Sequence, residues 1–229
     1  MRKKLSKRLS ACLDALSSLS SFADIGCDHA YLPCYAVLQG IIDSAIAIEV
    51  IDGPLAQAKQ TIAHYGLTHK IEVRKGSGLG PLSIGEVEGL NIAGMGGKLI
   101  SQLLLASLPI AKSMEILALQ PQGKEALLRR TLFENDFAII NEQLVEEEGI
   151  IYTIITAKPS RHLEFVELDV TFGPILRKDV KNKLFIKKWH QEIAAIDEIL
   201  SKIPNDNERK KEFEQKKQLI KDVLAHVTS

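Results

Sequence analysis

The residues with the clearest potential for chemistry follow a short apolar run, in the stretch D-I-G-C-D-H-A-Y-L-P that begins at Asp24. Gly26 would let a ligand approach the backbone, and a helix starting after it would offer unpaired N–H groups. Because no G-x-G-x-x-G is present, this single glycine suits a ligand without a pyrophosphate. Asp24 would repel phosphates and suits a cationic group such as an α-ammonium or a sulfonium. The alternative is an ordinary tight turn between a strand and a helix.

A second carboxylate, Glu49, ends the next apolar run, 23 residues after Gly26. Nucleotide-binding α/β folds place an acceptor for both ribose hydroxyls at the tip of the second strand. Taken alone, Glu49 is more often a solvated strand end, but together with Gly26 it predicts ribose binding. The loop Gly76–Gly78 follows the third apolar run at the same edge and could bracket an adenine.

A glycine-rich loop, N-I-A-G-M-G-G-K, runs from Asn91 to Lys98 after the fourth apolar run. At the carboxyl end of a central strand, such a loop leaves the backbone open to a ligand. We expect it to face the substrate, the alternative being a flexible connection. Gln122, after the fifth run, could hydrogen-bond a base edge, although helix capping suits it equally well.

The three cysteines, Cys12, Cys27 and Cys34, have neither C-x-x-C nor C-x-x-H spacing. Neither a disulfide framework nor a zinc site is indicated, because both need such pairs. We expect reduced thiols that serve mainly in packing, and no bound metal.

The elements that position these loops alternate between short apolar runs and helical stretches, which predicts βαβ units and a parallel sheet with helices on both faces. The expected strands are Ser21–Ile25, Ser44–Val50, Ile71–Arg74, Gly89–Ala93 and Glu115–Leu119. The expected helices cover 5–20, His29–Gln39, Gly53–Tyr65, Gly97–Leu105 and Lys124–Asn135.

The last two strands of the sheet are expected to be antiparallel, unlike the strands before them. The runs Phe137–Val145 and Ile150–Lys158 are joined by an acidic turn with no room for a helix, so they predict an antiparallel hairpin. A mostly parallel sheet finished by such a hairpin is the arrangement of class I S-adenosylmethionine methyltransferases. A dinucleotide dehydrogenase would be expected to finish with a parallel strand.

Beyond residue 174 the pattern becomes purely helical. Apolar residues at steps of three and four from Phe185 to Ile203, a break at Pro204-Asn205-Asp206 and a second stripe from Phe213 predict an antiparallel helical hairpin. Its narrow stripe and lysine-rich outer faces predict a projecting, coiled-coil-like arm. We therefore expect a domain over 1–174 and a C-terminal arm over 175–229.

Composition excludes several classes of protein. The chain has 229 residues, of which 45% are hydrophobic, 25% charged and 5% aromatic, so a disordered protein is excluded. No apolar run approaches the ~20 residues that a membrane span needs, and the N-terminal residues lack a signal peptide's apolar stretch. We expect a cytoplasmic protein without membrane contact.

The net charge of zero hides a segregation of charges. Residues 1–8 carry five basic residues and no acid, residues 9–176 carry 11 basic against 20 acidic residues, and residues 177–229 carry 13 against 9. Basic ends suggest a polyanionic partner, because phosphate contacts need clustered Lys and Arg. Lysine-rich helices that serve only solubility are the alternative.

Taken together, DIGCDHAYLP, Glu49, the GSGL loop, NIAGMGGKLI, LQPQ and the helical arm resemble the bacterial tRNA (adenine-22, N1) methyltransferase family over essentially the whole chain. The resemblance implies a Rossmann-like class I methyltransferase domain with a coiled-coil arm, S-adenosyl-L-methionine as methyl donor and N1 of a tRNA adenine as acceptor. One departure is Ser77, where the family commonly has an aspartate, which puts a side-chain contact with the adenine amino group in doubt.

The residues and the resemblance together give three expected sets. The cofactor set is Asp24, Gly26, Cys27, Glu49, Val50, Gly76, Ser77, Gly78, Asn91, Ala93, Gly94 and Met95. The substrate set is Gly96, Gly97, Lys98, Gln122, Lys210, Lys211, Lys216 and Lys217. The catalytic set is Asp28, His29 and Tyr31, with Tyr31 stacking on the base and Asp28 or His29 accepting charge or a proton.

Other interpretations remain open at this point. His29 could cap or pack a helix, and Tyr31 could fill the cofactor pocket. The chain could methylate another RNA, a protein or a small molecule, or bind nucleotides or tRNA without catalysis. The oligomeric state is not determined by the sequence, and a monomer is favoured.

Overall fold

The computed structural model describes residues 4–161, 164–179, 181–204 and 208–228. Packing divides the chain into two compact units, Met1–Gly173 and Pro174–Ser229. The interpretation of these parts as a methyltransferase domain and an arm that serves it stays a prediction.

The first unit contains a seven-stranded sheet in the order β3-β2-β1-β4-β5-β7-β6. The strands are β1 (Ser21–Ile25), β2 (Ser44–Glu49), β3 (Ile71–Lys75), β4 (Gly89–Met95), β5 (Ile116–Pro121), β6 (Phe137–Glu147) and β7 (Ile150–Pro159). The first five are parallel to one another, and β7 pairs antiparallel with both β5 and β6. The predicted Rossmann-like methyltransferase sheet with an antiparallel final hairpin is confirmed.

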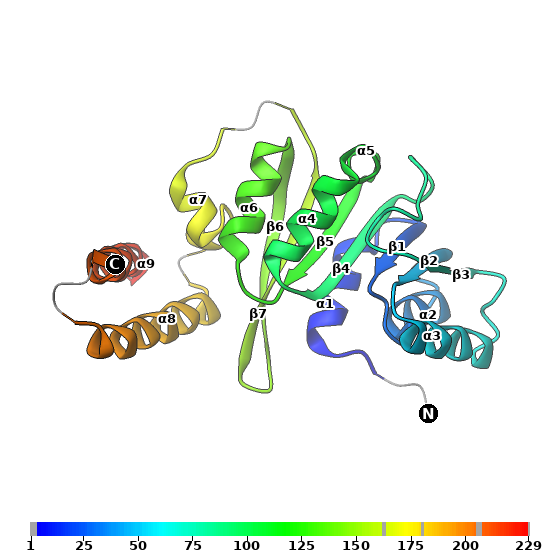
Figure 1. Cartoon of the computed structure of the whole chain (residues 1–229), viewed down its shortest axis with the longest axis horizontal. Coiled ribbons are helices and arrows are strands. Elements are labelled where there is room, and N and C mark those ends of the chain that lie inside the picture. Colours follow the sequence, from blue (N-terminus) through cyan, green and yellow to red (C-terminus); the bar gives the residue numbers. More distant parts are fainter. Residues whose placement is uncertain (1–3, 162–163, 180, 205–207, 229) are drawn as a thin grey trace. The chain divides into compact units, whose positions relative to one another are not determined.

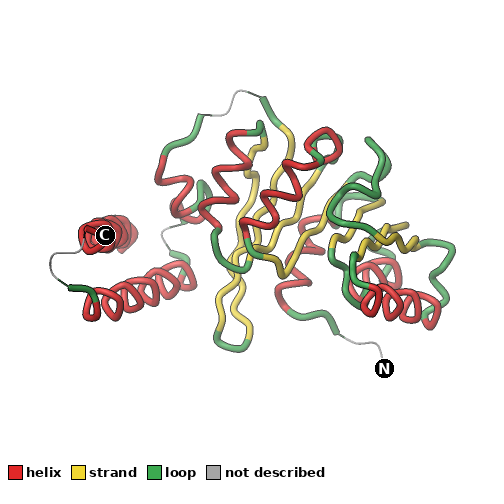
Figure 2. The backbone as a smooth tube through the Cα atoms, viewed as in Figure 1, coloured by secondary structure: helices red, strands yellow, loops and turns green. Residues whose placement is uncertain are grey.

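Helices cover both faces of this sheet (Figures 1 and 2). They are α1 (Lys7–Leu16), α2 (Tyr31–Leu38), α3 (Asp52–His64), α4 (Gly97–Ala106), α5 (Leu108–Ala111), α6 (Glu125–Glu134) and α7 (Glu167–Phe172). Side chains of α4 and α6 join the hydrophobic core on one face, and those of α1, α2 and α3 join the core on the other. Strands β1 and β2 bury alternate side chains in these two cores, because successive residues point to opposite faces of a sheet.

The first part of the chain after β1 differs from the expected helix. The helix was expected from His29, but α2 begins at Tyr31, because Asp28 and Ala30 both adopt the left-handed conformation, with φ of 51° and 54°. An alanine at positive φ carries a steric cost that surrounding structure must offset. The loop before α2 therefore has an unfavourable backbone conformation, which the surrounding structure must stabilise.

The acidic turn between β6 and β7 has a simple geometric basis. Glu147 pairs with Ile150, so Glu148 and Gly149 form a two-residue connection in which both residues have positive φ. Two such residues fit the tight turn whose twist matches that of the paired strands. The predicted hairpin is confirmed, and its strands are one or two residues longer than expected.

The second unit consists of a short 3-10 helix (Leu176–Lys178) and the helices α8 (Lys183–Lys202) and α9 (Glu208–Thr228). Asn182 caps α8 by accepting hydrogen bonds from the backbone N–H groups of Leu184 and Phe185. The apolar stripes bury Phe185, Trp189 and Ile196 of α8 and Ile220 and Leu224 of α9. The predicted pair of helices is present, whereas the coiled-coil geometry stays a prediction; residues 205 and 206 of the expected break lie outside the described residues.

The three cysteines are free and buried, as expected. Burial raises the pKa of the Cys34 thiol to about 12. Among the described residues, no helix is long and apolar enough to cross a membrane.

Candidate functional site

A cavity of about 600 Å³ opens at the carboxyl ends of the parallel strands, between the loops that follow β1, β2, β3 and β4. Its wall includes every residue of the expected cofactor set except Cys27. Parallel strands place these loops at one edge of the sheet, which is why residues far apart in sequence meet there.

The carboxylate of Glu49 is fixed by backbone groups on the cavity wall. Its Oε1 accepts hydrogen bonds from the N–H groups of Val50 and Ile51, at 2.8 and 3.0 Å. Its Oε2 accepts a 3.3 Å hydrogen bond from the N–H of Asp28. A carboxylate has about four acceptor positions, so Glu49 is oriented by the backbone and still able to accept from a ligand hydroxyl.

Asp24 and Asn91 form a buried polar pair on neighbouring strands. Asn91 Nδ2 donates a 2.7 Å hydrogen bond to Asp24 Oδ1. Burial raises the pKa of Asp24 to about 6, partly offset by this hydrogen bond, and the charge of Glu49 raises it further. Asn91 Oδ1 is buried without a hydrogen-bond partner among the described residues. An unpaired buried acceptor costs about 1–3 kcal/mol, so the pair is suited to a ligand that donates hydrogen bonds and carries positive charge.

A third buried polar residue extends this row. Gln120 of β5 is fully buried, and the register pairs it with Ala93, two residues beyond Asn91 on β4. Phe22, Ala93 and Ala118 belong to the core under α1, so alternation along the strands places Asp24, Asn91 and Gln120 on that same face. The polar row therefore lies beneath α1.

Helix α1 contributes a cation to the cavity. Arg8 lines the cavity and donates a 2.9 Å hydrogen bond from Nη1 to Gln120 Oε1, which also accepts from the N–H of Gly94 at 3.0 Å. The Arg8 guanidinium lies 5.8 Å from the centre of the Tyr152 ring, and its Nε is 4.0 Å from Glu147. Arg8 was not among the expected site residues.

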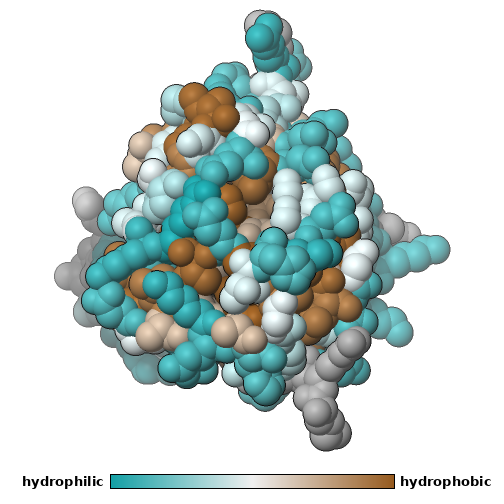
Figure 3. Space-filling view, turned by 90° about the vertical axis from the view of Figure 1, so that its right-hand side faces the viewer, coloured by the Kyte–Doolittle hydropathy of each residue, from teal (hydrophilic) through white to brown (hydrophobic). Residues whose placement is uncertain are grey.

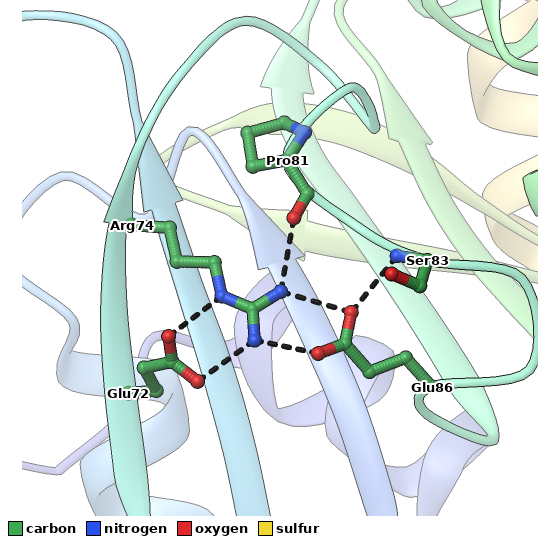
Figure 4. Close-up of polar contacts among 5 residues, drawn as sticks. All are labelled: Glu72, Arg74, Pro81, Ser83 and Glu86. Atoms are coloured by element: carbon green, nitrogen blue, oxygen red, sulfur yellow. Dashed lines mark hydrogen bonds and ion pairs between the residues drawn. The ribbon is translucent and has the colours of Figure 1, made fainter.

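A network centred on Arg74 holds the loop that brackets the far end of the cavity (Figure 4). Arg74 makes paired hydrogen bonds to the carboxylates of Glu72 and Glu86 and donates a 2.9 Å hydrogen bond to the carbonyl oxygen of Pro81. Its hydrogen bonds lower the pKa of Glu86 to about 2. The loop Gly76–Gly78, which lines the cavity, is thus tied to β3 through the carbonyl of Pro81.

Apolar side chains flank the same part of the cavity. Val50, Ile51, Leu99 and Leu103 all line it, and Val50 and Ile51 are 54% and 60% exposed. Hydrophobic patches interrupt the hydrophilic surface on the side of the molecule drawn in Figure 3. Exposed apolar groups beside a polar carboxylate suit an aromatic base that is attached to a sugar.

Two of the three expected catalytic residues line the cavity, and the third does not. Asp28 and Tyr31 line the cavity, whereas His29 does not. His29 Nε2 lies 3.5 Å from Asp28 Oδ1, its ring centre lies 5.5 Å from that of Tyr31, and its Nδ1 is buried without a partner among the described residues. Because Ala30 is left-handed, the chain turns between His29 and Tyr31 and presents the tyrosine to the cavity.

Several expected residues lie outside the cavity wall. Cys27 packs in the core under α1, and Gly96, Gly97 and Lys98 do not line the cavity. A Cβ at Gly97 would lie 2.5 Å from the carbonyl oxygen of Lys124, so this glycine permits α4 to begin close against the loop after β5. Its expected role in facing the substrate stays a prediction. Gln122 lines the cavity, and its expected hydrogen bond to a base edge stays a prediction.

The four expected arm lysines belong to the second unit. Lys216 pairs with Glu192 at 2.5 Å, and Lys217 pairs with Asp197. These two lysines thus link α9 to α8. Lys211 is exposed.

Several of the cavity-lining residues that the sequence analysis missed lie on two helices. Arg8 and Leu9 lie on α1, and Leu99 and Leu103 lie on α4, both outside the loops that end the strands. A signal for Arg8 existed: it is one turn before Cys12 and borders the apolar stripe of α1, so its side chain had to lie near the buried face. Residues 1–8 contain five basic residues, and their total charge alone did not distinguish Arg8 from the other four.

The wall as a whole suits a nucleoside with a charged tail. Glu49 offers acceptors for hydroxyls, the apolar flank and the 76–78 loop suit a base, and Asp24 with Asn91 suits a cationic donor. No group of three or more His, Cys, Asp or Glu side chains in the described part of the chain is placed to hold a metal ion.

Comparison with known proteins agrees with a site for a nucleoside that carries a charged tail. Residues 22–226 match the family model TrmK, described as tRNA (adenine(22)-N(1))-methyltransferase. The tRNA (adenine(22)-N(1))-methyltransferase of Bacillus subtilis is 37% identical over 97% of this chain and 98% of its own length.

Solved structures resemble this one over nearly the whole chain. Streptococcus pneumoniae Sp1610 has a TM-score of 0.92 and 38% identity, covering 96% of this chain and 100% of that one, and it has also been solved with S-adenosyl-L-methionine. Mycoplasma capricolum TrmK, in complex with S-adenosyl-homocysteine, has a TM-score of 0.86 and 26% identity, covering 98% of this chain and 100% of that one.

Proposed function

The chain belongs to the tRNA (adenine(22)-N(1))-methyltransferase family, and from this membership we propose that it methylates N1 of adenine 22 in tRNA. S-adenosyl-L-methionine is its cofactor and supplies, when bound, the methyl group that is transferred. The observation in this structure that supports the proposal best is the buried Asp24–Asn91 pair with its unpartnered acceptor, because the α-ammonium of this cofactor is both cationic and a hydrogen-bond donor.

The chain's residues fit the cofactor along its length. Glu49 is oriented by three backbone N–H groups and keeps an acceptor position for a ribose hydroxyl. Val50, Ile51 and the loop Gly76–Gly78 enclose the adenine. Ser77 replaces the family's usual aspartate and offers a hydroxyl where a carboxylate would accept from the adenine amino group. Met95 and Gly94 border the part of the cavity next to Asn91.

Alignment is the main task of the protein, because displacement of a methyl group by a ring nitrogen requires the two to lie in line. N1 of adenine is occupied in a Watson–Crick pair, so the target base must be unpaired or extruded to reach the cavity. Tyr31, which lines the cavity at the start of α2, is placed to stack on that base. Base–aromatic stacking contributes about 1–3 kcal/mol.

Asp28 is the better placed of the two expected charge acceptors. Methylation at N1 leaves the adenine positively charged until the exocyclic amino group loses a proton. The Asp28 carboxylate lines the cavity and is largely exposed, so it can stabilise this charge and pass the proton to water. His29 lies behind it, with Nε2 3.5 Å from Asp28, and serves to orient the carboxylate.

The tRNA is held mainly through its backbone in this proposal. Exposed Lys98 and Lys124 lie near the start of α4 and α6, and the arm supplies further lysines such as Lys211 and Lys221. Such contacts position the RNA without reading its sequence. The substrate supports the proposal that the protein works in the cytoplasm.

The test is methyl transfer to defined RNA. Purified protein is incubated with labelled S-adenosyl-L-methionine and either a tRNA transcript with adenine at position 22 or the same transcript with guanine there, and the RNA is digested to nucleosides. We expect 1-methyladenosine from the first transcript alone. Label on another nucleotide would contradict the N1 or position-22 assignment, and cofactor binding without any labelled nucleoside would favour a non-catalytic binding module.

A further inference from the structure

Two glutamines at the end of β5 have different surroundings. Gln120 is fully buried, and both ends of its amide are hydrogen-bonded within the protein. Gln122 is exposed and lines the cavity, and its side-chain amide makes no hydrogen bond in the part of the chain that the structure describes. The amide of Gln122 is therefore open to a ligand.

Helix capping, the other role that suits Gln122, is not what the structure shows. Helix α6 begins at Glu125, and its cap residue is Lys124, which makes no side-chain hydrogen bond to the described residues of the helix. Gln122 lies two residues before this cap, and its amide is equally unbonded. An exposed amide that does not cap a helix, placed on a cavity wall, is suited to ligand recognition.

The backbone of Gln122 is held on both sides by the glycine-rich loop after β4. Its N–H donates a 2.7 Å hydrogen bond to the carbonyl of Met95, and the carbonyl of Gly123 accepts a 3.0 Å hydrogen bond from the N–H of Gly97. A Cβ at Gly94 would lie 3.9 Å from Gln122 Nε2, so the amide lies beside the end of β4. A fixed backbone thus presents an unbonded side chain, which is how a recognition group is best held.

This part of the cavity is the part that the target base must reach. A Cβ at Gly26 would clash with the end of the Met95 side chain, so Met95 lies between the first loop and Gln122. The adenine and ribose of the cofactor belong to the loop Gly76–Gly78 and to Glu49, and the transferred methyl group is on the sulfur beyond the ribose. A base that accepts this methyl group therefore approaches on the side of Met95, where Gln122 lies.

The reaction determines which edge of the adenine a protein side chain can bind. N1 lies on the Watson–Crick edge and must face the methyl group, so no protein group can occupy it. The adjoining edge carries the N6 amino donor and the N7 acceptor, and a glutamine amide can pair with both at once. Guanine carries two acceptors, O6 and N7, on this edge, so the same amide pairs with guanine less well.

We propose that Gln122 binds the N6–N7 edge of the target adenine and selects adenine over guanine while it leaves N1 free. Its Oε1 accepts a hydrogen bond from the amino group, and its Nε2 donates one to N7. Because methylation at N1 places positive charge on the amino group, the hydrogen bond to Oε1 strengthens as the methyl group is transferred. This assignment rests on the proposed function and adds the selection of the base to it.

A change of one ring atom in the RNA tests the assignment. One tRNA carries adenine at position 22, and the other carries 7-deazaadenine there, in which a C–H group replaces N7 and N1 is retained. The measured quantity is the ratio of kcat/KM for the first tRNA to kcat/KM for the second. Comparison of this ratio between the wild-type protein and a variant cancels any difference in the reactivity of N1 between the two bases.

Two substitutions of Gln122 remove the donor to N7. Gln122→Met removes both hydrogen bonds, and Gln122→Glu keeps an acceptor for the amino group. We expect the ratio to be roughly tenfold lower in each variant than in the wild-type protein, the size expected when one hydrogen bond is lost and its partner is left unpaired. An unchanged ratio in either variant would overturn the assignment even if turnover fell, because Gln122 would then only support its loop.

Gln102→Met is the matched control. Gln102 is an exposed glutamine of α4 that does not line the cavity, so the ratio should stay at the wild-type value. Calorimetry should give all three variants the wild-type affinity for S-adenosyl-homocysteine, and a loss of this affinity in Gln122→Met would overturn the assignment by placing Gln122 in the cofactor site. Failure of the proposed function has a different signature, because the wild-type protein would then methylate neither tRNA.

Discussion

Asn91 donates a 2.7 Å hydrogen bond to the carboxylate of Asp24 across the β1–β4 pair, and the other oxygen of the Asn91 amide is left without a partner among the described residues. A folded protein rarely leaves a buried acceptor in this state. We propose that a bound ligand supplies the missing donor at this part of the sheet, and that the Asp24 carboxylate then sets the pH dependence of binding.

Cofactor affinity should fall as the pH is lowered through about 6. Burial raises the pKa of Asp24 to about 6, and only the ionised carboxylate attracts an ammonium group, so protonation below that pH removes the attraction. Binding of S-adenosyl-homocysteine, followed by calorimetry from pH 7.5 to 5, should weaken by up to about tenfold per pH unit below 6. The variant Asp24→Asn should bind weakly with a flat profile; a flat profile in the wild-type protein would contradict the role of Asp24.

Glu49→Ala should weaken binding of the cofactor by roughly 1–3 kcal/mol, because the ribose loses its carboxylate acceptor. Calorimetry with S-adenosyl-L-methionine measures the loss. Asp52→Ala is the control, since Asp52 is an exposed carboxylate three residues further on that pairs with Lys75 outside the cavity wall. Unchanged affinity in Glu49→Ala would show that this carboxylate serves only its own backbone.

Arg74→Met should lower both stability and cofactor affinity. The substitution removes hydrogen bonds to Glu72, Glu86 and Pro81, so the loop Gly76–Gly78 loses its tie to β3. We expect a loss of about 1–2 kcal/mol in unfolding free energy and weaker binding of S-adenosyl-homocysteine. Arg130→Met, which removes an exposed pair with Glu167, is the control and should leave binding unchanged. If Arg74→Met is less stable but binds S-adenosyl-homocysteine with wild-type affinity, the hydrogen bonds of Arg74 are not needed to position the loop Gly76–Gly78 for binding.

Tyr31→Ala should reduce turnover with a smaller effect on cofactor affinity. The ring that stacks on the target adenine contributes on the order of 1–3 kcal/mol, whereas Tyr31→Phe keeps the ring and should retain most of the activity. Single-turnover methylation and calorimetry on both variants separate the two effects. Loss of cofactor binding with normal turnover of the bound enzyme would place Tyr31 in the cofactor pocket.

Charge reversal in the arm should weaken methylation of tRNA in a salt-dependent way. Lys216 and Lys217 are unsuitable, because each pairs with an acidic residue of α8 and reversal would disturb the helix pair. Lys211→Glu with Lys221→Glu changes exposed positions and should reduce kcat/KM for tRNA by roughly tenfold at low salt, with less effect at high salt.

The control is a second double variant that reverses the same number of charges outside the arm. Lys59→Glu with Lys70→Glu reverses two exposed lysines of the first unit that do not line the cavity, and it should leave kcat/KM near the wild-type value. Equal losses in both double variants would indicate a general charge effect and would remove the reason to assign tRNA binding to the arm.

The loops that end the strands were predictable because parallel strands bring their carboxyl ends to one edge. Glu49, Asn91 and Gly26 were found in this way, each from a short apolar run followed by a polar residue or glycine. Their place on the cavity wall follows from local pattern and from a general property of the fold, without knowledge of packing, while their binding roles stay predictions.

Local sequence pattern did not predict the surroundings of three residues, Arg8, His29 and Gly97. Arg8 reaches the cavity because α1 folds back over β4 and β5, which is a tertiary relationship that no spacing in the sequence expresses. His29 is turned from the cavity by the left-handed Ala30, and a strained alanine is not predictable from its residue type. Gly97 was read as open to a ligand, whereas the carbonyl groups of residues 123 and 124 occupy the space beside it.

The position of α1 has a consequence for how the protein is made. This helix is synthesised before the sheet, yet it packs on β4, β5, β6 and β7, which leave the ribosome later. Its apolar face, with Cys12, Leu13 and Leu16, has no complete sheet to cover until the final hairpin has been translated. We therefore expect nascent chains that end before β7 to expose this face and to be recognised by chaperones, and we expect ligand binding to begin only once the last strands have joined the sheet.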